Sequence, residues 1–305
     1  MTISIRNIFD QNILLLKELD RANFYFRNQQ YDNALHIVAT SVGQIKSAVD
    51  AIIRDRDYFH LVTTDIVLDM LTGILNAQKK RNYVLLADLL ELQLISFLCG
   101  VQELIISREE IVFDEGKYIN NVRRMGETWT GFPEDGLEDI NPGVLLEGGY
   151  RVEFTSTGLM TLSAQNGGSE FYMHTNSRIY SEALQLAGYW YQRNINTYIL
   201  YGFGMGYHAE VLLDLAPEAV LEVYEADLNV LKLSCAFRDV TGLLENSRLK
   251  LYYDPEHTKL KQRLQGLSEA EKFLIHYPSF QNIRNQAGRE IMESFIPWSK
   301  TLETG

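Results

Sequence analysis

The stretch YILYGFGMGYHAEVLLDL, residues 198–215, decides the fold. An apolar run typical of a buried strand leads through three alternate glycines, Gly202, Gly204 and Gly206, into a helical pattern. Glycine permits positive φ and lets the main chain come close to a ligand. The helix start offers free N–H groups and a partial positive charge to an anion. The stretch therefore predicts a strand–turn–helix unit with a ligand site on the glycine turn.

The same alternation of strand and helix continues to the end of the chain. Apolar, β-prone runs are found at 197–203, 219–227, 247–254 and 271–278, and helical patterns follow them at 209–216, 228–244, 257–267 and 281–295. Apolar strands that alternate with amphipathic helices form a parallel, doubly wound sheet with right-handed crossovers. In such a sheet, ligands bind beyond the carboxyl ends of the strands, where the strand order reverses.

A different pattern precedes this region. Short β-prone runs at 150–154, 159–164 and 170–173 are separated by the turn sequences TSTG and QNGGS, which predicts a small antiparallel meander. A helix is expected to follow, roughly from Ser177 to Arg193, with Asn176 or Ser177 as its N-cap.

Residues 1–126 are predicted to be helical throughout and to form a bundle. Apolar residues recur there at three- and four-residue spacing: Ile8, Leu15, Leu16, Leu19, Leu35, Val38, Val42, Ile45, Val49, Ile52, Ile66, Leu68, Leu71, Leu75, Leu85, Leu89, Leu92 and Ile95. The segment TGFPEDGLEDINPGVLLEGG, 130–149, concentrates Gly, Pro and acidic residues, as connectors do. We therefore predict a helical bundle at 1–130, a linker at 131–149, and a Rossmann-like α/β domain with an N-terminal meander at 150–305.

Composition excludes several classes of function. The formal net charge of −12, without any long cationic run, argues against nucleic-acid binding, which requires clustered Lys and Arg. The longest apolar stretch, 85–98, is interrupted by Asp88, Glu91 and Gln93, so no membrane span is expected. Cys99 and Cys235 lie far apart in apolar contexts and are expected to be reduced core thiols. The N-terminus lacks the pattern of a secretion signal. We expect a soluble, cytoplasmic protein.

The glycine turn leaves three interpretations open. Glu225 follows Gly202 by 23 residues, near the spacing at which an acidic residue accepts hydrogen bonds from ribose hydroxyls. A dinucleotide motif would need glycine where the chain has Tyr207. The spacing G-x-G-x-G is closer to that of S-adenosylmethionine-dependent methyltransferases. That class usually has an acidic residue at the position of Leu200 and an Asp/Asn-Pro-Pro-Tyr motif where this chain has HYPS, 276–279. A structural turn without a ligand is the third interpretation.

Histidines flank the same turn. His208 follows the glycines and His276 ends the fourth strand, so both are expected at one crevice with Tyr207 and Tyr277. Each could contact a phosphate or act as a general base, or could simply hydrogen-bond at the sheet edge. The remaining histidines are scattered and no H-E-x-x-H spacing exists, so no metal site is predicted. The chain also lacks a G-x-S-x-G elbow, a Walker lysine and a cysteine–histidine pair.

The region 150–280 resembles the N-terminal part of the motility-associated factor (Maf) glycosyltransferases, which are related to 6-hydroxymethylpterin pyrophosphokinase. The resemblance rests on the meander, the His174–Ser177 stretch, the "EA" pair Glu182–Ala183, the run GFGMGYH (202–208) and the strand that ends in Glu225. It covers roughly half of the chain. The helical N-terminal part has no counterpart that we can place in the family.

The resemblance implies a bacterial protein connected with flagellar or other surface glycosylation. Maf proteins transfer nonulosonic acids from CMP-activated donors, and their transfer domain follows the region matched here; we expect none in this chain. We therefore expect an accessory module that binds a nucleotide or nucleotide sugar, with the helical bundle available to a protein partner. The candidate ligand-binding residues are Gly202, Gly204, Gly206, Tyr207, His208, Glu225 and His276. S-adenosylmethionine as cofactor of a methyltransferase and a ligand-free interaction module are the alternatives. No catalytic residue is predicted, and no reaction is identified.

Overall fold

The computed structural model describes residues 3–59, 64–109, 115–130 and 149–295. It divides into two compact units, and the chain alternates between them. The helical unit comprises residues 1–112, 154–159 and 176–185, and the α/β unit comprises residues 113–153, 160–175 and 186–305. Each unit has its own core and is described separately. The fold class predicted from the sequence is confirmed.

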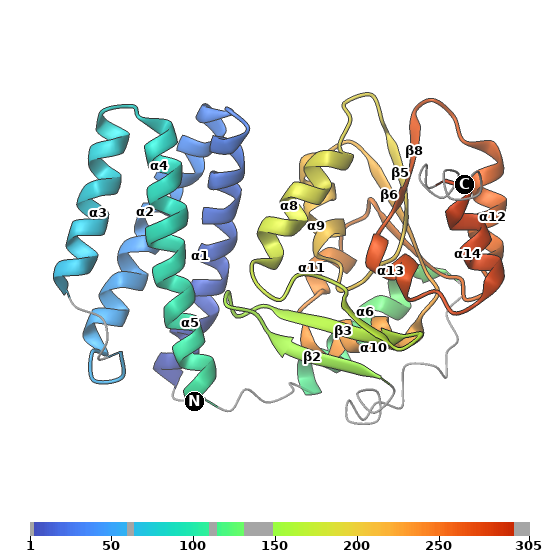
Figure 1. Ribbon diagram of the computed structural model, residues 1–305, viewed down its shortest axis with the longest axis horizontal. Helices are drawn as coiled ribbons and strands as arrows, with labels where there is room; N and C mark the ends of the chain where they lie inside the picture. Colours follow the sequence, from blue (N-terminus) through green and yellow to red (C-terminus); the bar gives the residue numbers. More distant parts are fainter. Residues whose placement is uncertain (1–2, 60–63, 110–114, 131–148, 296–305) are drawn as a thin grey trace. The chain divides into compact units, whose positions relative to one another are not determined.

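The helical unit is built mainly from long helices (Figure 1). They are α1 (Ile3–Arg27), α2 (Tyr31–Arg54), α3 (Thr64–Lys79), α4 (Tyr83–Leu89), the π-helical segment η1 (Leu90–Ile95) and α5 (Ser96–Arg108). The turns before α2 and α4 each contain a residue with positive φ, Gln29 and Arg81. Asn82 then caps α4 by accepting a hydrogen bond from the main-chain N–H of Leu85.

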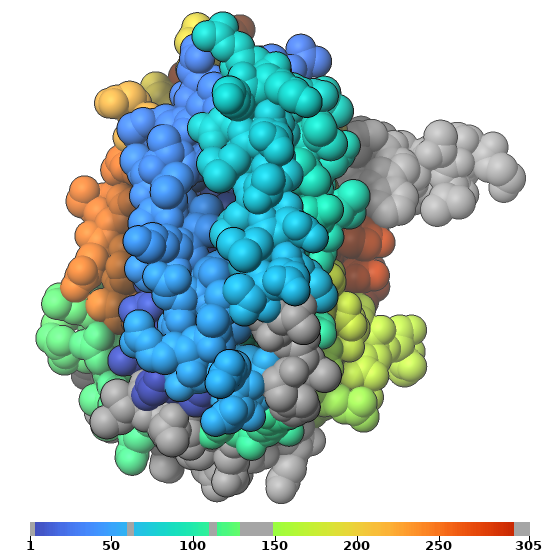
Figure 2. All heavy atoms as spheres, turned by 90° about the vertical axis from the view of Figure 1, so that its left-hand side faces the viewer, coloured from blue at the N-terminus to red at the C-terminus, as the bar shows by residue number. Residues whose placement is uncertain are grey.

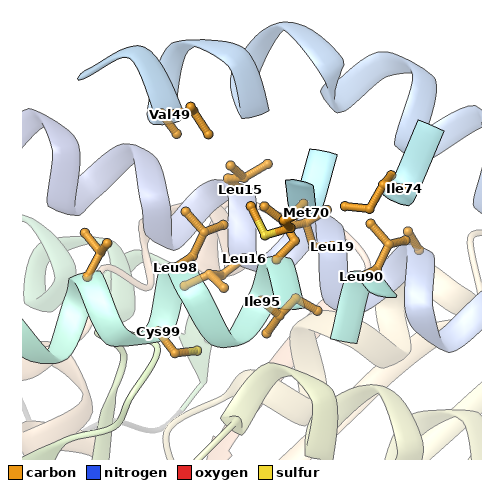
Figure 3. Close-up of a cluster of buried hydrophobic side chains, with 14 of the residues drawn as sticks. Leu15, Leu16, Leu19, Val49, Met70, Ile74, Leu90, Ile95, Leu98 and Cys99 are labelled. Carbon is orange, nitrogen blue, oxygen red and sulfur yellow. The ribbon is translucent and has the colours of Figure 1, made fainter. Parts of the chain in front are cut away.

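One continuous core holds these helices together. Figure 3 shows side chains from α1, α3 and the η1–α5 region converging, among them Leu16, Met70 and Leu90. Leu15, Leu16, Leu19, Val49 and Ile52 are all buried, as their spacing predicted. Burial of such side chains contributes roughly 1.5–3 kcal/mol each.

Six of the periodic apolar positions are exposed. Val42, Ile66, Leu68, Leu75, Leu85 and Leu92 are between 43% and 70% exposed. Figure 2 shows that α2 and α3 form one face of the helical unit, and four of the six residues belong to these two helices. A helix buries only one stripe, so apolar residues beyond that stripe remain at the surface.

The helix Tyr83–Arg108 is long and apolar enough to cross a membrane by length and composition, and it is the one such helix in the described ranges. Its apolar stripe, which includes Leu86, Leu90, Leu94 and Leu98, is completely buried in the core of the helical unit. A core helix passes the same test.

A partly buried ionic network ties residues 176–185 to the rest of the helical unit. Arg178 pairs with Asp20 of α1 and, at 2.9 Å, with Glu91 of η1; Glu91 also pairs with Arg27 at 2.8 Å. Burial raises the pKa of Asp20 to about 6, against the lowering effect of Arg178. Burial also acts to raise the pKa of Glu91, but hydrogen bonds from Arg27, Asn23 and Arg178 outweigh it and lower that pKa to about 2. The network gives the π-helical turn a structural role.

The α/β unit contains a five-stranded sheet in which every pair of neighbouring strands is parallel. Its order is β1 (Trp129–Thr130), β7 (Leu249–Tyr253), β6 (Val220–Glu225), β5 (Thr197–Tyr201) and β8 (Glu271–Ile275). β5 and β6 are adjacent, and the strand order reverses between β5 and β8. The glycine turn after β5 therefore lies at the switch point.

Helices cover both faces of this sheet (Figure 1). α9 (Tyr207–Leu215) lies on one side, and α12 (Thr258–Arg263) and α14 (Gln286–Glu293) lie on the other. On the second side, Ile199 and Tyr201 of β5 pack with Leu260 of α12 and Met292 of α14. Strands buried on both faces read as continuous apolar runs, which explains why YILY was recognisable as a strand.

The smaller sheet has the order β2 (Tyr150–Phe154), β3 (Met160–Asn166) and β4 (Ser169–Tyr172), close to the predicted meander. β3 and β4 are antiparallel. The helix expected at 177–193 is α8, Ile179–Trp190.

Two long helices expected in the α/β unit are each interrupted. The helix expected at 228–244 consists of α10 (Leu228–Phe237) and α11 (Thr241–Leu244), because Arg238 takes an extended conformation. The side chain of Asn121 bonds the carbonyls of Cys235 and Arg238 and the N–H of Val240 across the break. Of the helix expected at 281–295, residue 281 ends α13 (Tyr277–Gln281), which begins within the strand expected at 271–278, and the helix resumes only at α14, which Asn285 caps. The segment expected to be helical at 257–267 contains α12 and the 3-10 turn η3 (Leu264–Gly266).

The division between the units differs from the predicted boundary at residue 130. α6 (Glu115–Thr128) and β1 belong to the α/β unit, because Asn121 of α6 is buried against the break after α10 and β1 extends the sheet beside β7. The predicted linker, 131–149, lies outside the described residues except for Gly149. Cys99 and Cys235 are both free and buried, one in each unit.

Leu90→Ala should lower the free energy of unfolding of the helical unit by roughly 2–5 kcal/mol, because it leaves a cavity at a fully buried position. Leu92→Ala, two residues away in the same π-helical segment and 70% exposed, is the matched control and should change it by less than about 0.5 kcal/mol. Urea unfolding followed by circular dichroism measures both. Equal effects of the two variants would contradict the described core.

Candidate functional site

The glycine turn has the backbone conformation that the sequence predicts. Gly202, Gly204 and Gly206 have φ values of +99°, +51° and +78°. A Cβ atom at Gly202 would overlap the side chain of Ser279, and one at Gly204 would lie 2.9 Å from His174 Nε2. The glycines are therefore required both by conformation and by close packing of the protein's own side chains.

Main-chain N–H groups of the turn already have partners within the protein. The N–H of Phe203 donates to Glu225 Oε2 at 2.9 Å, and the N–H of Met205 donates to His174 Nε2 at 3.1 Å. Residues 202–208 are all buried. An anion on this turn would have to displace these groups.

Glu225 binds main chain on both sides of the crevice. Besides Phe203, it accepts hydrogen bonds at Oε1 from the N–H groups of Ala226 and Asp227, each at 2.9 Å. Burial raises the pKa of Glu225 to about 7, although the three main-chain bonds act in the opposite direction. The carboxylate therefore fixes the end of β6 against the glycine turn.

Three histidines lie together beneath the turn. The rings of His208 and His276 stack with centroids 4.2 Å apart, and the ring of His174 lies 5.1 Å from that of His276. All three are buried. His208 Nε2 lies 3.1 Å from the Gly202 carbonyl, and His276 Nδ1 lies 2.8 Å from Ser279 Oγ.

Burial is the main cause that lowers the pKa of His208 and of His276 well below the usual value, and the neighbouring histidines add to it. A weak contact with the Met173 carbonyl acts on His276 in the opposite direction. Both rings are therefore neutral near pH 7, with His208 Nδ1 and His276 Nε2 lacking a hydrogen-bond partner.

The donor atoms of the three histidines lie within 4.8 Å of one another, close enough to suggest a metal site. The ring planes do not fit one. A metal ion lies in the plane of each imidazole that binds it, whereas the planes of His208 and His276 are inclined by only 15° and stack face to face. His174 Nε2 is also occupied by the N–H of Met205. The absence of a metal site stays a prediction, and the ring geometry supports it.

Tyr207, another predicted ligand-binding residue, is also buried. Its hydroxyl donates to the Met160 carbonyl at 2.9 Å, and the Arg238 guanidinium lies 3.9 Å from the centre of its ring. Burial raises the pKa of Tyr207 to about 12, against the lowering effect of Arg238. Tyr207 thus joins α9 to β3.

A cavity of about 310 Å³ opens beside the turn, beyond the carboxyl ends of β5, β6 and β7. Of the predicted site residues, Glu225 alone lines it. The lining residues are Tyr150, Tyr201, Glu225, Ala226, Asp227, Leu228, Asn229, Tyr253, Pro255, His257, Ser279, Asn282, Ile283, Arg284 and Asn285. Parallel sheets bind ligands at this edge.

The floor of this cavity is rich in hydrogen-bond acceptors. Asp227 Oδ2 accepts from the Tyr150 hydroxyl and, at 2.7 Å, from Asn282 Nδ2, while its Oδ1 accepts from the N–H of Asn229 at 2.9 Å. A carboxylate has about four acceptor positions, so Asp227 and Glu225, with three bonds each, have about one left apiece. Asn282 Oδ1 is buried and has no hydrogen-bond partner in the part of the chain that the structure describes. The cavity is therefore suited to a ligand group that donates hydrogen bonds.

Several of these residues escaped the sequence reasoning. Asp227 follows Glu225 by two positions and caps α10, so its position before a helical pattern was a usable signal. Tyr150, Asn282 and Arg284 come from segments far from the strand ends in sequence, and no local pattern marks them. His257 was set aside as scattered, but it lines the cavity and lies 3.1 Å from the Tyr201 hydroxyl.

Alanine substitution should separate backbone strain from packing in the glycine turn. Gly167→Ala, at φ +60° with open space around its Cβ, should cost about 1–2 kcal/mol. Gly204→Ala has a similar φ but forces its Cβ against His174 and His276, so it should cost measurably more. Chemical unfolding of the two variants gives both values. Equal losses would show that the space above Gly204 is open.

The histidine cluster should make the α/β unit less stable in acid. Below pH 6.5 the unfolded chain takes up protons that buried His208 and His276 do not, so stability falls by up to about 1.4 kcal/mol per pH unit for each histidine. Glu225 acts oppositely between pH 4.5 and 7, because its folded pKa is the higher one. Between about pH 4.5 and 6.5, the unfolded chain therefore binds about one more proton at these three groups than the folded chain does.

His208→Gln should therefore make the stability of the α/β unit nearly independent of pH between pH 6.5 and 5. The stability lost through His276 as the pH falls is then offset by the stability gained through Glu225. Gln can still donate to the Gly202 carbonyl. Thermal unfolding at several pH values compares this variant with the wild type. His36→Gln, at an exposed position of α2, is the control. A slope in His208→Gln as steep as in the wild type would contradict the assignment.

Comparison with known proteins adds little to this geometry. No family model and no curated protein matches the chain. One solved structure, that of MnmC2 from Aquifex aeolicus, is similar over 50% of this chain and 58% of that one, with 16% identity and a TM-score of 0.23. The chain thus spans just over half of the length of that protein.

Proposed function

We propose that the α/β unit binds a small molecule that contains a nucleoside, a nucleotide or nucleotide sugar, in the cavity beside the glycine turn. The observation that carries the proposal is the set of free acceptor positions on Glu225, Asp227 and Asn282 at the floor of that cavity. A ribose presents two neighbouring hydroxyl donors, which suit a pair of carboxylates two residues apart. Tyr253, which lines the cavity and is partly exposed, offers an apolar face for the rest of a nucleoside.

The resemblance to the Maf family supports the biological part of the proposal. The chain would serve as an accessory, cytoplasmic module of bacterial surface glycosylation. The helical unit would then contact a protein partner, for which α3 offers the exposed apolar side chains of Ile66, Leu68 and Leu75.

A second function, S-adenosylmethionine binding by a methyltransferase, is favoured by the charge of the same cavity. Glu225 and Asp227 both line it, and Asp254 and Glu256 are sequence neighbours of the lining residue Pro255. Carboxylates attract a positively charged sulfonium, whereas they repel a phosphate chain. Because both ligands contain a ribose, contacts between the cavity and the ribose would not distinguish them.

Isothermal titration calorimetry of the full chain with cytidine, CMP, UMP, adenosine and S-adenosylmethionine tests the proposal. Each ligand is compared with its 2′,3′-dideoxy counterpart where one exists. Loss of hydrogen bonds to the carboxylates, about 1.5–3 kcal/mol each, should weaken binding by roughly tenfold or more. Equal binding of cytidine and dideoxycytidine, or no binding by any of these compounds, would overturn it.

Asp227→Asn should reduce affinity for the same nucleoside while the fold is retained, because Asn also caps helices well. Asp239→Asn is the matched control: it removes the same charge from another capping position, before α11, that does not line the cavity. A ligand held at full affinity by Asp227→Asn would place the site elsewhere.

A further inference from the structure

Among the residues that the structure describes, Arg284 is the one permanently cationic residue that lines the cavity. It is exposed and has no carboxylate within ion-pair distance among the residues that the structure describes. Arg178, Arg238 and Arg263, by contrast, are all paired with acidic side chains. The guanidinium at the cavity is thus available to an anion from solution.

The cavity is lined both by the cationic side chain of Arg284 and by acidic side chains. Arg284 directly precedes Asn285, the N-cap of α14, whose side chain accepts from the N–H of Gly288 at 2.7 Å. The start of a helix adds a partial positive charge. The charge of Arg284 also acts on the Tyr150 hydroxyl. Burial and Asp227 raise the pKa of that hydroxyl, and Arg284 acts to lower it. The carboxylates of Glu225 and Asp227 line the same cavity.

Two observations point to a ligand here. The buried acceptor Asn282 Oδ1, without a partner, lines the same cavity two residues before Arg284. The predicted anion site, on the glycine turn, is occupied by the protein's own groups, Glu225 on the N–H of Phe203 and His174 on the N–H of Met205. A ligand with both hydroxyl donors and an anionic group would therefore find partners for both among the residues of one cavity.

We infer that Arg284 binds the anionic group of the nucleoside ligand, a phosphate or a carboxylate, and that this group does not lie on the glycine turn. The inference rests on the proposed function and narrows it to nucleosides with an attached anion. Arg binds phosphate and carboxylate through paired N–H donors, and such charge-assisted bonds are about twice as strong as neutral ones. Arg284 is then the residue that selects a nucleotide over its nucleoside.

The test compares ligand pairs that differ in the anionic group alone. The wild type should bind CMP roughly tenfold more tightly than cytidine, and the preference should shrink as salt is added. Arg284→Gln should bind CMP and cytidine about equally, with the affinity for cytidine unchanged. Lys261→Gln, which removes a positive charge from an exposed position of α12 that does not line the cavity, should behave as the wild type.

A second pair separates the two sources of negative charge. S-adenosylhomocysteine carries an amino acid group, with a carboxylate and an ammonium, on the side of the ribose where CMP carries a phosphate. Its decarboxylated analogue, which lacks that carboxylate alone, is the reference. If the wild type prefers the anionic member of the cytidine pair and Arg284→Gln does not, the anion that Arg284 binds is a phosphate. The same result within the pair of adenosine compounds identifies that anion as a carboxylate.

The outcomes that overturn the inference differ from those that overturn the proposed function. A CMP or S-adenosylhomocysteine preference that survives in Arg284→Gln, or no preference in the wild type, disproves the role of Arg284 and leaves nucleoside binding intact. Failure of every nucleoside and nucleotide to bind the wild type disproves the proposed function itself.

Discussion

The Glu225 carboxylate is the constraint on which the ligand-binding edge of the α/β unit depends. It ends β6, receives the N–H of Phe203 from the turn after β5, and receives the N–H groups of Ala226 and Asp227 as the chain leaves the strand. One buried side chain thereby fixes two neighbouring loops at the carboxyl edge of the sheet. Asp227 is held in position by these bonds, and its own carboxylate then holds Tyr150 and Asn282 around the cavity.

This arrangement changes the meaning of the glycine-rich motif. In a phosphate-binding turn, glycine leaves room for the ligand. In this chain the space above Gly202 and Gly204 is filled by the protein's own side chains. Ser279 belongs to α13, His276 directly follows β8, and His174 lies in the segment after β4. The histidines of the run GFGMGYH and of HYPS are thus part of one packed layer. The motif marks the switch point of the sheet, and the cavity opens next to it.

Strands and fold class were accessible from the sequence because the parallel strands are buried on both faces and read as continuous apolar runs. The breaks at Arg238 and before Asn285 were not, because they depend on side chains from α6 and on capping that only the tertiary structure reveals. Glu225 was found from its distance to Gly202 along the chain. Tyr150, Asn282 and Arg284 could not be found in this way, since their proximity arises from three separate segments that meet at the sheet edge. Exposed Leu92 and Ile66 show the same limit: periodicity identifies an apolar helix but not the width of its buried stripe.

The alternation of the chain between its two units has a consequence for how the protein can be divided. The path leaves the helical unit after residue 112, returns for 154–159 and again for 176–185, and ends in the α/β unit. Arg178, which completes the charge network of α1 and η1, is therefore encoded after the meander and not with the helices it stabilises. A single cut anywhere between residues 113 and 185 deprives at least one unit of a segment of its own, so a fragment that begins at the meander would carry helical-unit residues without the helices that receive them.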